Sequence, residues 1–387
     1  MFRIGIVAGE ASGDLLGSEL ISAVRQEITD IEFTGIGGEM MKTAGCDCIY
    51  SIDKLSVMGI SEIFGKYFDL LNIRNNIKNF FIKNPPDLFI GIDSPDFNFP
   101  LEKMLRNAGI KTVHYVSPSI WAWREYRLKS IAKSTDLMLT LFPFEPDIYQ
   151  KYDIPAVFVG HPLAKKIDLK TDKSIKRKEL GLPENKKIIA ILPGSRASEL
   201  KKLVIPFLQT ADLCSKRFEN LCFISNLVSE DDKKYVDSLA RQLVPDIDIK
   251  FYIGKSWDVM GAADAVLLAS GTAALEAMLL KRPMVVAYKV SWLTYQVAKR
   301  LLRLPYVSLP NVLAGRMIVP ECLQYNCTPE NMSKELGVLL EDENKQEELN
   351  AEFTQLHKNI LPTSDNNIAR IILDKINESR NDGIIRC

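Results

Sequence analysis

The stretch that decides the fold is Phe2–Gly17, FRIGIVAGEASGDLLG. Phe2–Ala8 is short and almost continuously apolar, as is typical of a strand buried on both faces of a parallel sheet. The glycines of Gly9–Gly17 follow the spacing G-x-x-x-G-x-x-x-G, and a helical pattern continues to Val24. This spacing is not the dinucleotide fingerprint G-x-G-x-x-G, which weakens an NAD-binding interpretation. Strand, glycine turn and helix in this order predict the first unit of a doubly wound α/β fold.

The same alternation recurs in both halves of the chain, on either side of a Lys- and Asp-rich stretch from Lys165 to Lys187. We therefore predict two doubly wound, Rossmann-like α/β domains facing a cleft, with boundaries 1–165 and 166–345. C-terminal helices over 346–387 are expected to pack back on the N-terminal domain or to be exchanged in a dimer. The further strand-like runs are Asp87–Ile92, Thr112–Val116, Asp136–Leu141, Ala156–Val159, Lys187–Leu192, Leu221–Ile224, Lys250–Ile253, Ala265–Leu268 and Met284–Ala287.

Composition excludes several classes of protein. The 387 residues are 47% apolar, and 49 Lys and Arg balance 49 Asp and Glu, so no overall charge favours nucleic acid. The seven cysteines form no C-x-x-C motif, which indicates a reduced, cytoplasmic compartment. No signal peptide or run of about 18 apolar residues is recognisable, so any membrane contact is expected to be peripheral.

Ligands of such folds bind beyond the carboxyl ends of the strands. After the first strand, small residues and a helix start offer backbone N–H groups, although Ser12 as a simple helix cap is an equal alternative. Asp93, directly after a buried strand, is a candidate general base, and Asp96 is a second carboxylate that could perturb it. The alternative is that one of them only caps the turn opened by Pro95.

The segment His114–Arg124, HYVSPSIWAWR, is dense in aromatic side chains. Trp121 is expected to stack on a sugar or cover an acyl chain, and core packing is the alternative. Arg124 is expected to pair with phosphate or a carboxylate.

In the second half, two strands end in small polar residues at a helix start. Ser195 and Arg196 offer a diphosphate a hydroxyl, backbone N–H groups and a guanidinium that can form two parallel hydrogen bonds. Gly271, Thr272 and Ala273 repeat the arrangement, and Glu276 lies one turn further on the same helix face as Thr272, where it could accept from ribose hydroxyls. An ordinary helix start with a solvated Glu276 is the alternative.

Three later polar residues are candidates for reading the hydroxyls of a donor sugar: Asn311, Glu321 and Gln324. We expect neither a metal nor another cofactor, since only three histidines occur. The D-x-D string Asp246–Asp248 precedes a strand, so it is expected to be an exposed turn on the wrong edge of the sheet.

The segment Ile60–Lys83 carries more apolar residues than one core-facing stripe needs, with Lys and Arg interleaved. This pattern favours a helix lying on an anionic membrane, with a fully buried helix or a subunit contact as the alternatives. The expected membrane-contact residues are Ile63, Phe64, Tyr67, Leu70 and Leu71.

Several strings together resemble the lipid-A-disaccharide synthase family, over nearly the whole chain and in the family's order. They are GEASGDLLG (9–17), LSVMGI (55–60), DLFIGIDSPDFN (87–98), HYVSPSIWAWR (114–124), GHP (160–162), LPGSR (192–196), SGTAALE (270–276) and LPNVLAG (309–315).

The resemblance implies the glycosyltransferase-B fold and an inverting transfer. The donor would be UDP-2,3-diacylglucosamine, and the acceptor would be 2,3-diacylglucosamine 1-phosphate (lipid X). By this resemblance Asp93 matches the base for the acceptor 6-hydroxyl, and Glu10 matches a residue important for activity. The UDP-sugar side is matched by Arg196, Glu276, Asn311 and Gln324. The family is peripheral on the inner face of the inner membrane of Gram-negative bacteria, and the resemblance implies a homodimer with exchanged C-terminal parts.

Two other functions remain as alternatives. One is another UDP-N-acetylglucosamine-using glycosyltransferase or an epimerase of the same fold, which would not need the apolar surplus of 60–83. The other is a non-catalytic nucleotide-binding or membrane-adaptor protein, which would bind UDP without turnover.

Overall fold

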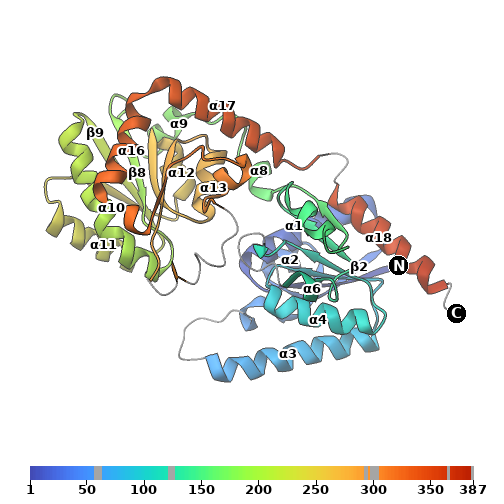
Figure 1. Cartoon of the computed structure of the whole chain (residues 1–387). Helices are drawn as coiled ribbons and strands as arrows, with labels where there is room; N and C mark the ends of the chain where they lie inside the picture. Colours follow the sequence, from blue (N-terminus) through green and yellow to red (C-terminus); the bar gives the residue numbers. More distant parts are fainter. Residues whose placement is uncertain (56–62, 121–126, 292–294, 297–304, 364–366, 385–387) are drawn as a thin grey trace. The chain divides into compact units, whose positions relative to one another are not determined.

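The computed structural model describes residues 1–55, 63–120, 127–291, 295–296, 305–363 and 367–384, and the side chains of these except 63–67 and 380–384. The chain forms two compact units (Figure 1). Unit 1 comprises Met1–Pro162 and Ile360–Cys387, and unit 2 comprises Leu163–Asn359.

Unit 1 is built on a seven-stranded parallel sheet of order β3-β2-β1-β4-β5-β6-β7. Its strands are β1 (Phe2–Ala8), β2 (Ile31–Gly37), β3 (Cys46–Ser51), β4 (Leu88–Ile92), β5 (Thr112–Tyr115), β6 (Leu137–Thr140) and β7 (Ala156–Phe158). Its helices are α1 (Ala11–Glu27), α2 (Glu39–Thr43), η1 (Ile52–Lys54), α3 (Ile63–Lys83), α4 (Pro95–Asn107), α6 (Leu128–Ile131), α7 (Glu145–Gln150) and α18 (Ile368–Ile384).

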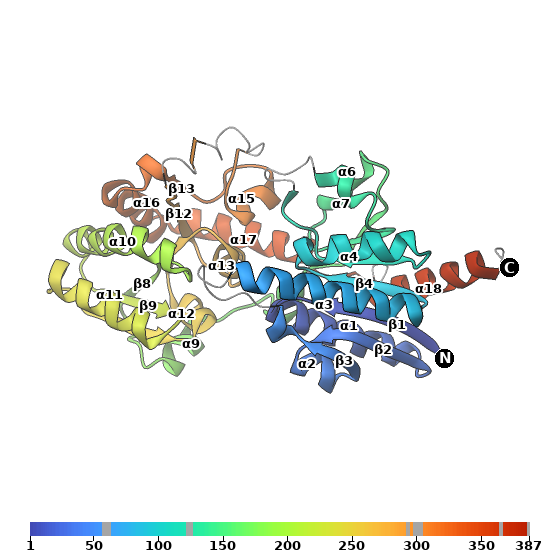
Figure 2. The same ribbon diagram turned by 90° about the horizontal axis from the view of Figure 1, so that it is seen from below.

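The sheet of unit 1 is covered on both faces, which is why β1 is apolar apart from Arg3 near its start. Ile4 and Ile6 belong to a core that includes α1 residues together with Ala369 and Ile372 of α18. Val7, on the opposite face of β1, packs in a second core with residues of α3 and α4. Figure 2 shows α3 lying along α4. Burial on both faces removes the alternation of polar and apolar residues that a half-exposed strand would show.

Unit 2 carries a six-stranded parallel sheet of order β10-β9-β8-β11-β12-β13. Its strands are β8 (Lys187–Leu192), β9 (Leu221–Leu227), β10 (Ile249–Ile253), β11 (Ala265–Ala269), β12 (Met284–Tyr288) and β13 (Glu321–Leu323). Its helices are α9 (Lys173–Glu179), α10 (Ala197–Arg217), α11 (Glu230–Leu243), α12 (Ser256–Ala262), α13 (Thr272–Leu279), α15 (Leu309–Ala314), η4 (Gln324–Asn326), α16 (Pro329–Glu341) and α17 (Glu343–Asn359). A short helix, α8 (Pro162–Lys166), spans the boundary between the units.

The C-terminal helices, predicted as one group over 346–387, are divided between the units. Helix α17 belongs to unit 2, whereas α18 packs against α1 in unit 1. The two chain segments at this boundary are tied together, since the His161 N–H donates to the Ile360 carbonyl at 2.8 Å. Gly160 has a φ of 87° and lies so close to the Pro362 backbone that a Cβ would collide with it. The boundary therefore follows Pro162, a few residues before the predicted linker.

Candidate functional site

In unit 1, the loops that carry Glu10 and Asp93 lie next to each other. They follow β1 and β4, which are neighbours in the sheet although the two loops begin far apart along the chain, at Gly9 and at Asp93. At this point the strand order reverses, and such switch points are where doubly wound sheets open a crevice for ligands. Gly9 touches Ser94 so closely that a Cβ on Gly9 would overlap the serine side chain. The glycine is thus required for the approach of the two loops.

Asp93 is held by its backbone in an unusual conformation. Asp93 and Ser94 have φ values of 51° and 44°, in the left-handed region that side chains other than glycine rarely adopt. The Asp93 N–H donates to the Tyr115 carbonyl at 2.9 Å, and its carbonyl accepts from Asn98 Nδ2 at 2.7 Å. Its half-buried carboxylate has no hydrogen bond or ion pair with any described residue. This leaves both carboxylate oxygens able to accept a proton from a ligand.

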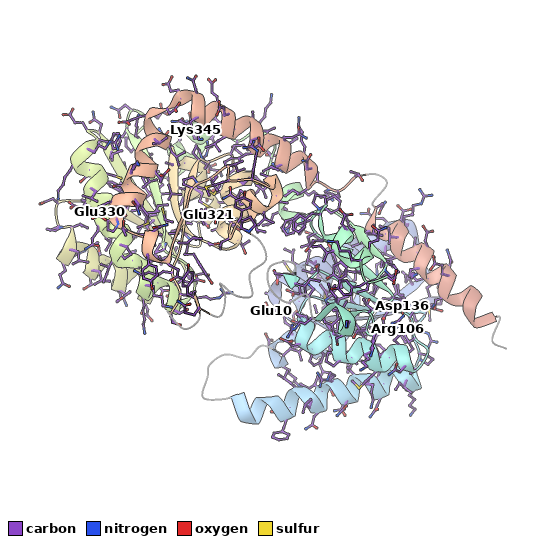
Figure 3. The ribbon with its side chains drawn as sticks, viewed as in Figure 1. Glu10, Arg106, Asp136, Glu321, Glu330 and Lys345 are labelled. Atoms are coloured by element: carbon purple, nitrogen blue, oxygen red, sulfur yellow. The ribbon has the colours of Figure 1, made fainter. Side chains whose placement is uncertain are left out.

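A cavity of about 340 Å³ lies beside these loops. One part of its wall is apolar and the other is polar or charged, a combination that suits a ligand with a sugar and a hydrocarbon part. The lining residues are Gly9, Glu10, Leu55, Leu70, Leu71, Arg74, Ser94, Pro95, Asp96 and Phe97. Glu10, labelled in Figure 3, precedes the first turn of α1, and its side chain does not cap that helix.

The other predicted residues of this half are placed differently. Asp96 is 82% exposed and pairs with Arg127 at 2.9 Å, so it does not contact the Asp93 carboxylate. Ser12 lies exposed in the first turn of α1. Trp121 and Arg124, and the string 56–60, lie outside the described residues. Arg74 and Arg127, which sequence reasoning missed, bring two cations to this edge of the sheet.

The structure of α3 differs in part from the expectation that the apolar surplus of 60–83 lies on a membrane. Ile77 and Phe81 are buried against the sheet, so some of the apolar surplus is core. Leu70 and Leu71 are half-buried in the cavity wall. Phe68 and Ile82 remain 66% and 47% exposed. Ile63, Phe64 and Tyr67 lie outside the described side chains.

Asp14 is a site-shaping residue that the sequence did not single out. Its buried carboxylate accepts hydrogen bonds from the backbone N–H groups of Gly38, Met40 and Met41 at 2.7–3.1 Å. It thereby ties the turn after β2 to the start of α1. Gly35 and Gly37 belong to β2, and Gly38 forms the turn between β2 and α2. Asp14 could have been predicted as a carboxylate in the first turn of a helix, followed along the chain by a second glycine-rich turn whose N–H groups it can bind.

In unit 2, the predicted nucleotide residues also meet at a switch point. The loops after β8 and β11 are neighbours, since these two strands pair in the centre of the sheet. Arg196 immediately precedes the 21-residue helix α10, and its guanidinium is 81% exposed. Its Nη1 lies 3.2 Å from Glu199 Oε1, a contact that a ligand anion could replace. Ser195 lies exposed beside it. The start of α10 therefore presents first-turn backbone N–H groups and an exposed cation on one edge.

The loop after β11 completes this edge. Gly271 and Thr272 are exposed at the start of α13, and Ala273 is half-buried behind them. Burial raises the pKa of the Glu276 carboxyl, and the neighbouring side chains of Trp257 and Ser256 oppose that rise. Glu276 thus lies half-buried on the flank of α13, one turn below the exposed start.

Asn311 and Glu321 have a different task from the one expected. Asn311 is fully buried: its Oδ1 accepts from the N–H groups of Ile318 and Val319, and its Nδ2 donates to the Val319 carbonyl and to Glu321. Glu321 also accepts from the backbone of Val307 and Ser308, just before α15. These two side chains shape the loops rather than presenting free groups to a sugar. Gln324 directly follows β13, with a φ of 50°, and its side chain forms no hydrogen bond with another described residue.

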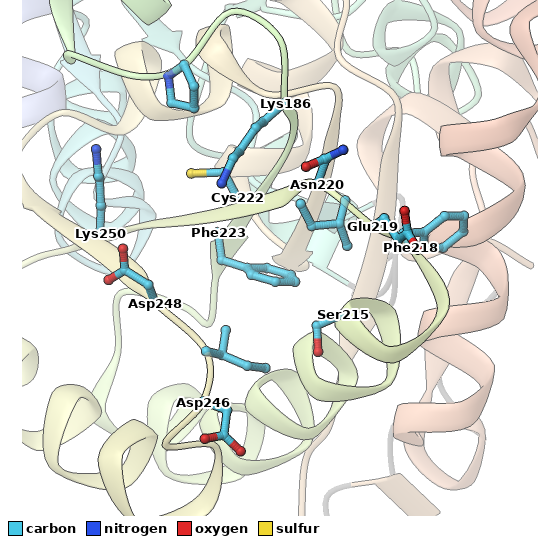
Figure 4. Close-up of a pocket in the computed structure, with 13 residues that line it drawn as sticks. Lys186, Ser215, Phe218, Glu219, Asn220, Cys222, Phe223, Asp246, Asp248 and Lys250 are labelled. Atoms are coloured by element: carbon cyan, nitrogen blue, oxygen red, sulfur yellow. The ribbon is translucent and has the colours of Figure 1, made fainter.

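Another cavity, of about 600 Å³, lies away from both of these edges, at the amino ends of the unit 2 strands. Lys186, Asp246, Asp248 and Lys250 are among the residues that line it (Figure 4). Asp246 and Asp248 are exposed in the turn before β10, as predicted for the D-x-D string. Ligands of doubly wound sheets bind at the opposite edge. Among the described residues, no group of three or more His, Cys, Asp or Glu side chains is arranged to hold a metal.

A family model described as lipid-A-disaccharide synthetase matches residues 4–372 of the chain. The chain belongs to this family. Relatives named lipid-A-disaccharide synthase agree: the protein of Vibrio campbellii is 46% identical, covering 97% of this chain and 98% of the relative. That of Psychromonas ingrahamii is 47% identical, covering 98% and 99%.

Solved structures show the fold of this lipid-A-disaccharide synthase family member. The UDP-N-acetylglucosamine 2-epimerase of Neisseria meningitidis has a TM-score of 0.62 at 13% identity, covering 97% of this chain and all of that one. The glycosyltransferase of kitacinnamycin also has a TM-score of 0.62, at 16% identity and 96% and 98% coverage. The predicted glycosyltransferase-B fold is confirmed. The predicted class is confirmed too: the chain is a glycosyltransferase enzyme of lipid A disaccharide synthesis. No helix in the described part of the chain is long and apolar enough to cross a membrane.

Proposed function

We propose that the chain condenses UDP-2,3-diacylglucosamine with 2,3-diacylglucosamine 1-phosphate in one inverting displacement. Asp93 takes the proton of the acceptor 6-hydroxyl while the oxygen of that hydroxyl attacks the anomeric carbon of the donor. The bond from that carbon to the UDP phosphate breaks, and the electron pair leaves with UDP. A single displacement inverts the anomeric carbon and gives the β-1,6-linked disaccharide 1-phosphate.

The observation that carries this proposal is the meeting of the Glu10 and Asp93 loops beside a cavity with an apolar wall. An unpaired carboxylate at a switch point can act as a general base once a hydroxyl lies within hydrogen-bond reach. Leu70, Leu71 and Phe97 would contact acyl chains, which avoids exposing them to water. Glu10 and Arg74 would contact polar groups of the acceptor sugar.

Unit 2 would hold the donor nucleotide. The starts of α10 and α13 follow neighbouring strands of the sheet. Arg196, at the start of α10, is exposed to solvent. Helix N-termini and a guanidinium stabilise the negative charge that builds up on the leaving diphosphate, so this chemistry requires no metal. Gly271, Thr272 and Glu276 would contact the nucleotide, and Gln324 would contact the donor sugar.

The test is an assay of the purified chain with both acylated substrates, read by mass spectrometry. We expect the disaccharide 1-phosphate and UDP, and unchanged turnover in EDTA. Product from UDP-N-acetylglucosamine alone would favour another transferase or an epimerase. UDP binding without any turnover would favour the adaptor alternative, and strong inhibition by EDTA would overturn the metal-free mechanism.

We further propose that the chain acts at the inner face of the inner membrane, where both acylated substrates reside. Phe68 and Ile82 are exposed on α3, at a helical spacing that puts them on the same side. Lys78 and Lys83 flank them, and cations beside exposed apolar residues suit an anionic lipid surface. A homodimer that exchanges its C-terminal parts would reuse the contact between α18 and α1.

Replacing Phe68 and Ile82 together with Ser is expected to weaken partitioning onto anionic vesicles by about tenfold or more, because apolar area no longer enters the lipid. Vesicle flotation measures the bound fraction. Ile205→Ser is the matched control, since Ile205 is 41% exposed on α10 of unit 2. Equal flotation of the double variant and this control would contradict a membrane role for α3.

A further inference from the structure

Three polar side chains are fully buried directly behind the Asp93 loop. Asn98 and Glu102 are one turn apart on α4, and His114 lies on β5. Glu102 Oε1 is 2.6 Å from His114 Nδ1, and the Phe99 ring stacks against the imidazole at 4.2 Å between centroids. We refer to Asn98, Glu102 and His114 as the buried polar cluster.

The buried polar cluster destabilises the core in which it lies. Asn98 Oδ1, Glu102 Oε2 and His114 Nε2 have no hydrogen-bond partner among the described residues. A buried polar atom without a partner lowers stability, whereas apolar side chains of similar size could fill the same space. Burial also raises the pKa of the Glu102 carboxyl, against the opposing influence of His114. Packing alone therefore does not account for these residue types at this place.

Asn98 connects the buried polar cluster to the backbone of Asp93. Asn98 Nδ2 donates to the Asp93 carbonyl at 2.7 Å and to the Ile92 carbonyl at 3.2 Å. The Asp93 N–H donates to the carbonyl of Tyr115, the residue after His114. Asn98 thus holds the carboxyl end of β4, and the backbone bond to Tyr115 holds Asp93 to the end of β5.

Glycine at position 91 allows this arrangement. Gly91 pairs in register with His114, and a Cβ on Gly91 would overlap Glu102 Oε1. Glu102 is therefore pressed against β4 two residues before Asp93. A left-handed conformation at two successive residues that are not glycine persists only where the surroundings impose it. Here the Asn98 hydrogen bond holds the Asp93 carbonyl, and Glu102 lies against the strand that leads into Asp93.

We propose that Asn98, Glu102 and His114 are positioning residues, which act through the backbone of Asp93 to hold its carboxylate in the orientation needed to take the acceptor proton. This inference rests on the proposed role of Asp93 as the base. None of the three is expected to touch a substrate, because all are buried beneath the loop.

Asn98→Ala and Glu102→Ala are expected to lower kcat about 10- to 100-fold, since a misplaced catalytic group costs that order of rate. KM for the donor and the affinity for UDP should not change. Glu102→Gln can still hydrogen-bond to His114 and should recover most of the lost rate. Thr112→Val is the matched control: Thr112 is equally buried, at the amino end of β5, where its hydroxyl donates to the Ser134 carbonyl at 2.9 Å. It should lower the melting temperature and leave kcat unchanged.

The deciding measurement adds Asn98→Ala to Asp93→Asn and records residual turnover. If Asn98 acts through Asp93, its effect should disappear in that background, because coupled residues are not additive. Multiplicative losses, or a normal kcat in Asn98→Ala while Asp93→Asn is inactive, would overturn the inference and leave the proposed function standing. Normal turnover in Asp93→Asn alone would overturn both.

Discussion

Asp93→Asn is expected to lower kcat by about 10²- to 10⁴-fold, which is the usual contribution of a general base. Asn is close to Asp in shape, so the left-handed backbone and its two hydrogen bonds should remain. What is lost is the ability to take the proton of the acceptor hydroxyl. Steady-state rates with both acylated substrates measure the loss, and UDP titration should show unchanged affinity.

Asp96→Asn is the matched control for this prediction. Asp96 follows the same strand as Asp93 and lines the cavity beside it, but it is 82% exposed and pairs with Arg127. Its replacement should change kcat by less than about tenfold, as expected for the loss of an exposed ion pair. Equal losses in the two variants would mean that general negative charge, and not a positioned base, is what the reaction needs.

Arg196→Ala is expected to lower kcat/KM for the donor by about 10²- to 10³-fold, the effect of removing one group that stabilises developing negative charge. Folding should be little affected, because the Arg196–Glu199 pair lies at the surface and such pairs contribute little. Arg196→Lys should recover only part of the rate, since an ammonium lacks the fork that matches a diphosphate. Donor kinetics and UDP titration together measure the change.

Arg217→Ala is the control at the other end of the same helix. Arg217 belongs to the last turn of α10 and pairs with Glu341 at 2.7 Å, so it shares the helix but not the proposed site. Its replacement should leave donor kinetics unchanged. If Arg217→Ala lowered kcat/KM as much as Arg196→Ala, the stability of α10 would explain both losses.

The strands most clearly predicted from sequence are those buried on both faces. The predicted ranges Phe2–Ala8 and Lys187–Leu192 coincide with β1 and β8, because short apolar runs bounded by turn residues are a local signal. β2, β3 and β13 were missed. β2 alternates polar and apolar residues and contains glycines, and β13 spans only three residues.

The site residues also divide into those that a local sequence pattern predicts and those that it does not. Arg196, Gly271 and Asp93 follow strands or begin helices, so their positions could be predicted from the neighbouring pattern. The tasks of Asn311 and Glu321 could not, since they depend on backbone groups of other loops that fold onto these side chains. Asn98 and Glu102 were missed for a related reason: a polar residue in a helix pattern is normally assigned to its exposed face.

Hydrophobic periodicity and turn chemistry act over a few residues, and they were enough to predict two α/β units and the loops that end their strands. Which of these loops meet is a property of the folded sheets. β1 pairs with β4 and β8 pairs with β11 because intervening strands are added on the far side of the first strand of each unit. That order brings the Glu10 loop to the Asp93 loop and the Arg196 loop to the Gly271 loop. It also turns Asn98, Glu102 and His114 inward, beneath the carboxylate that we assign as the base.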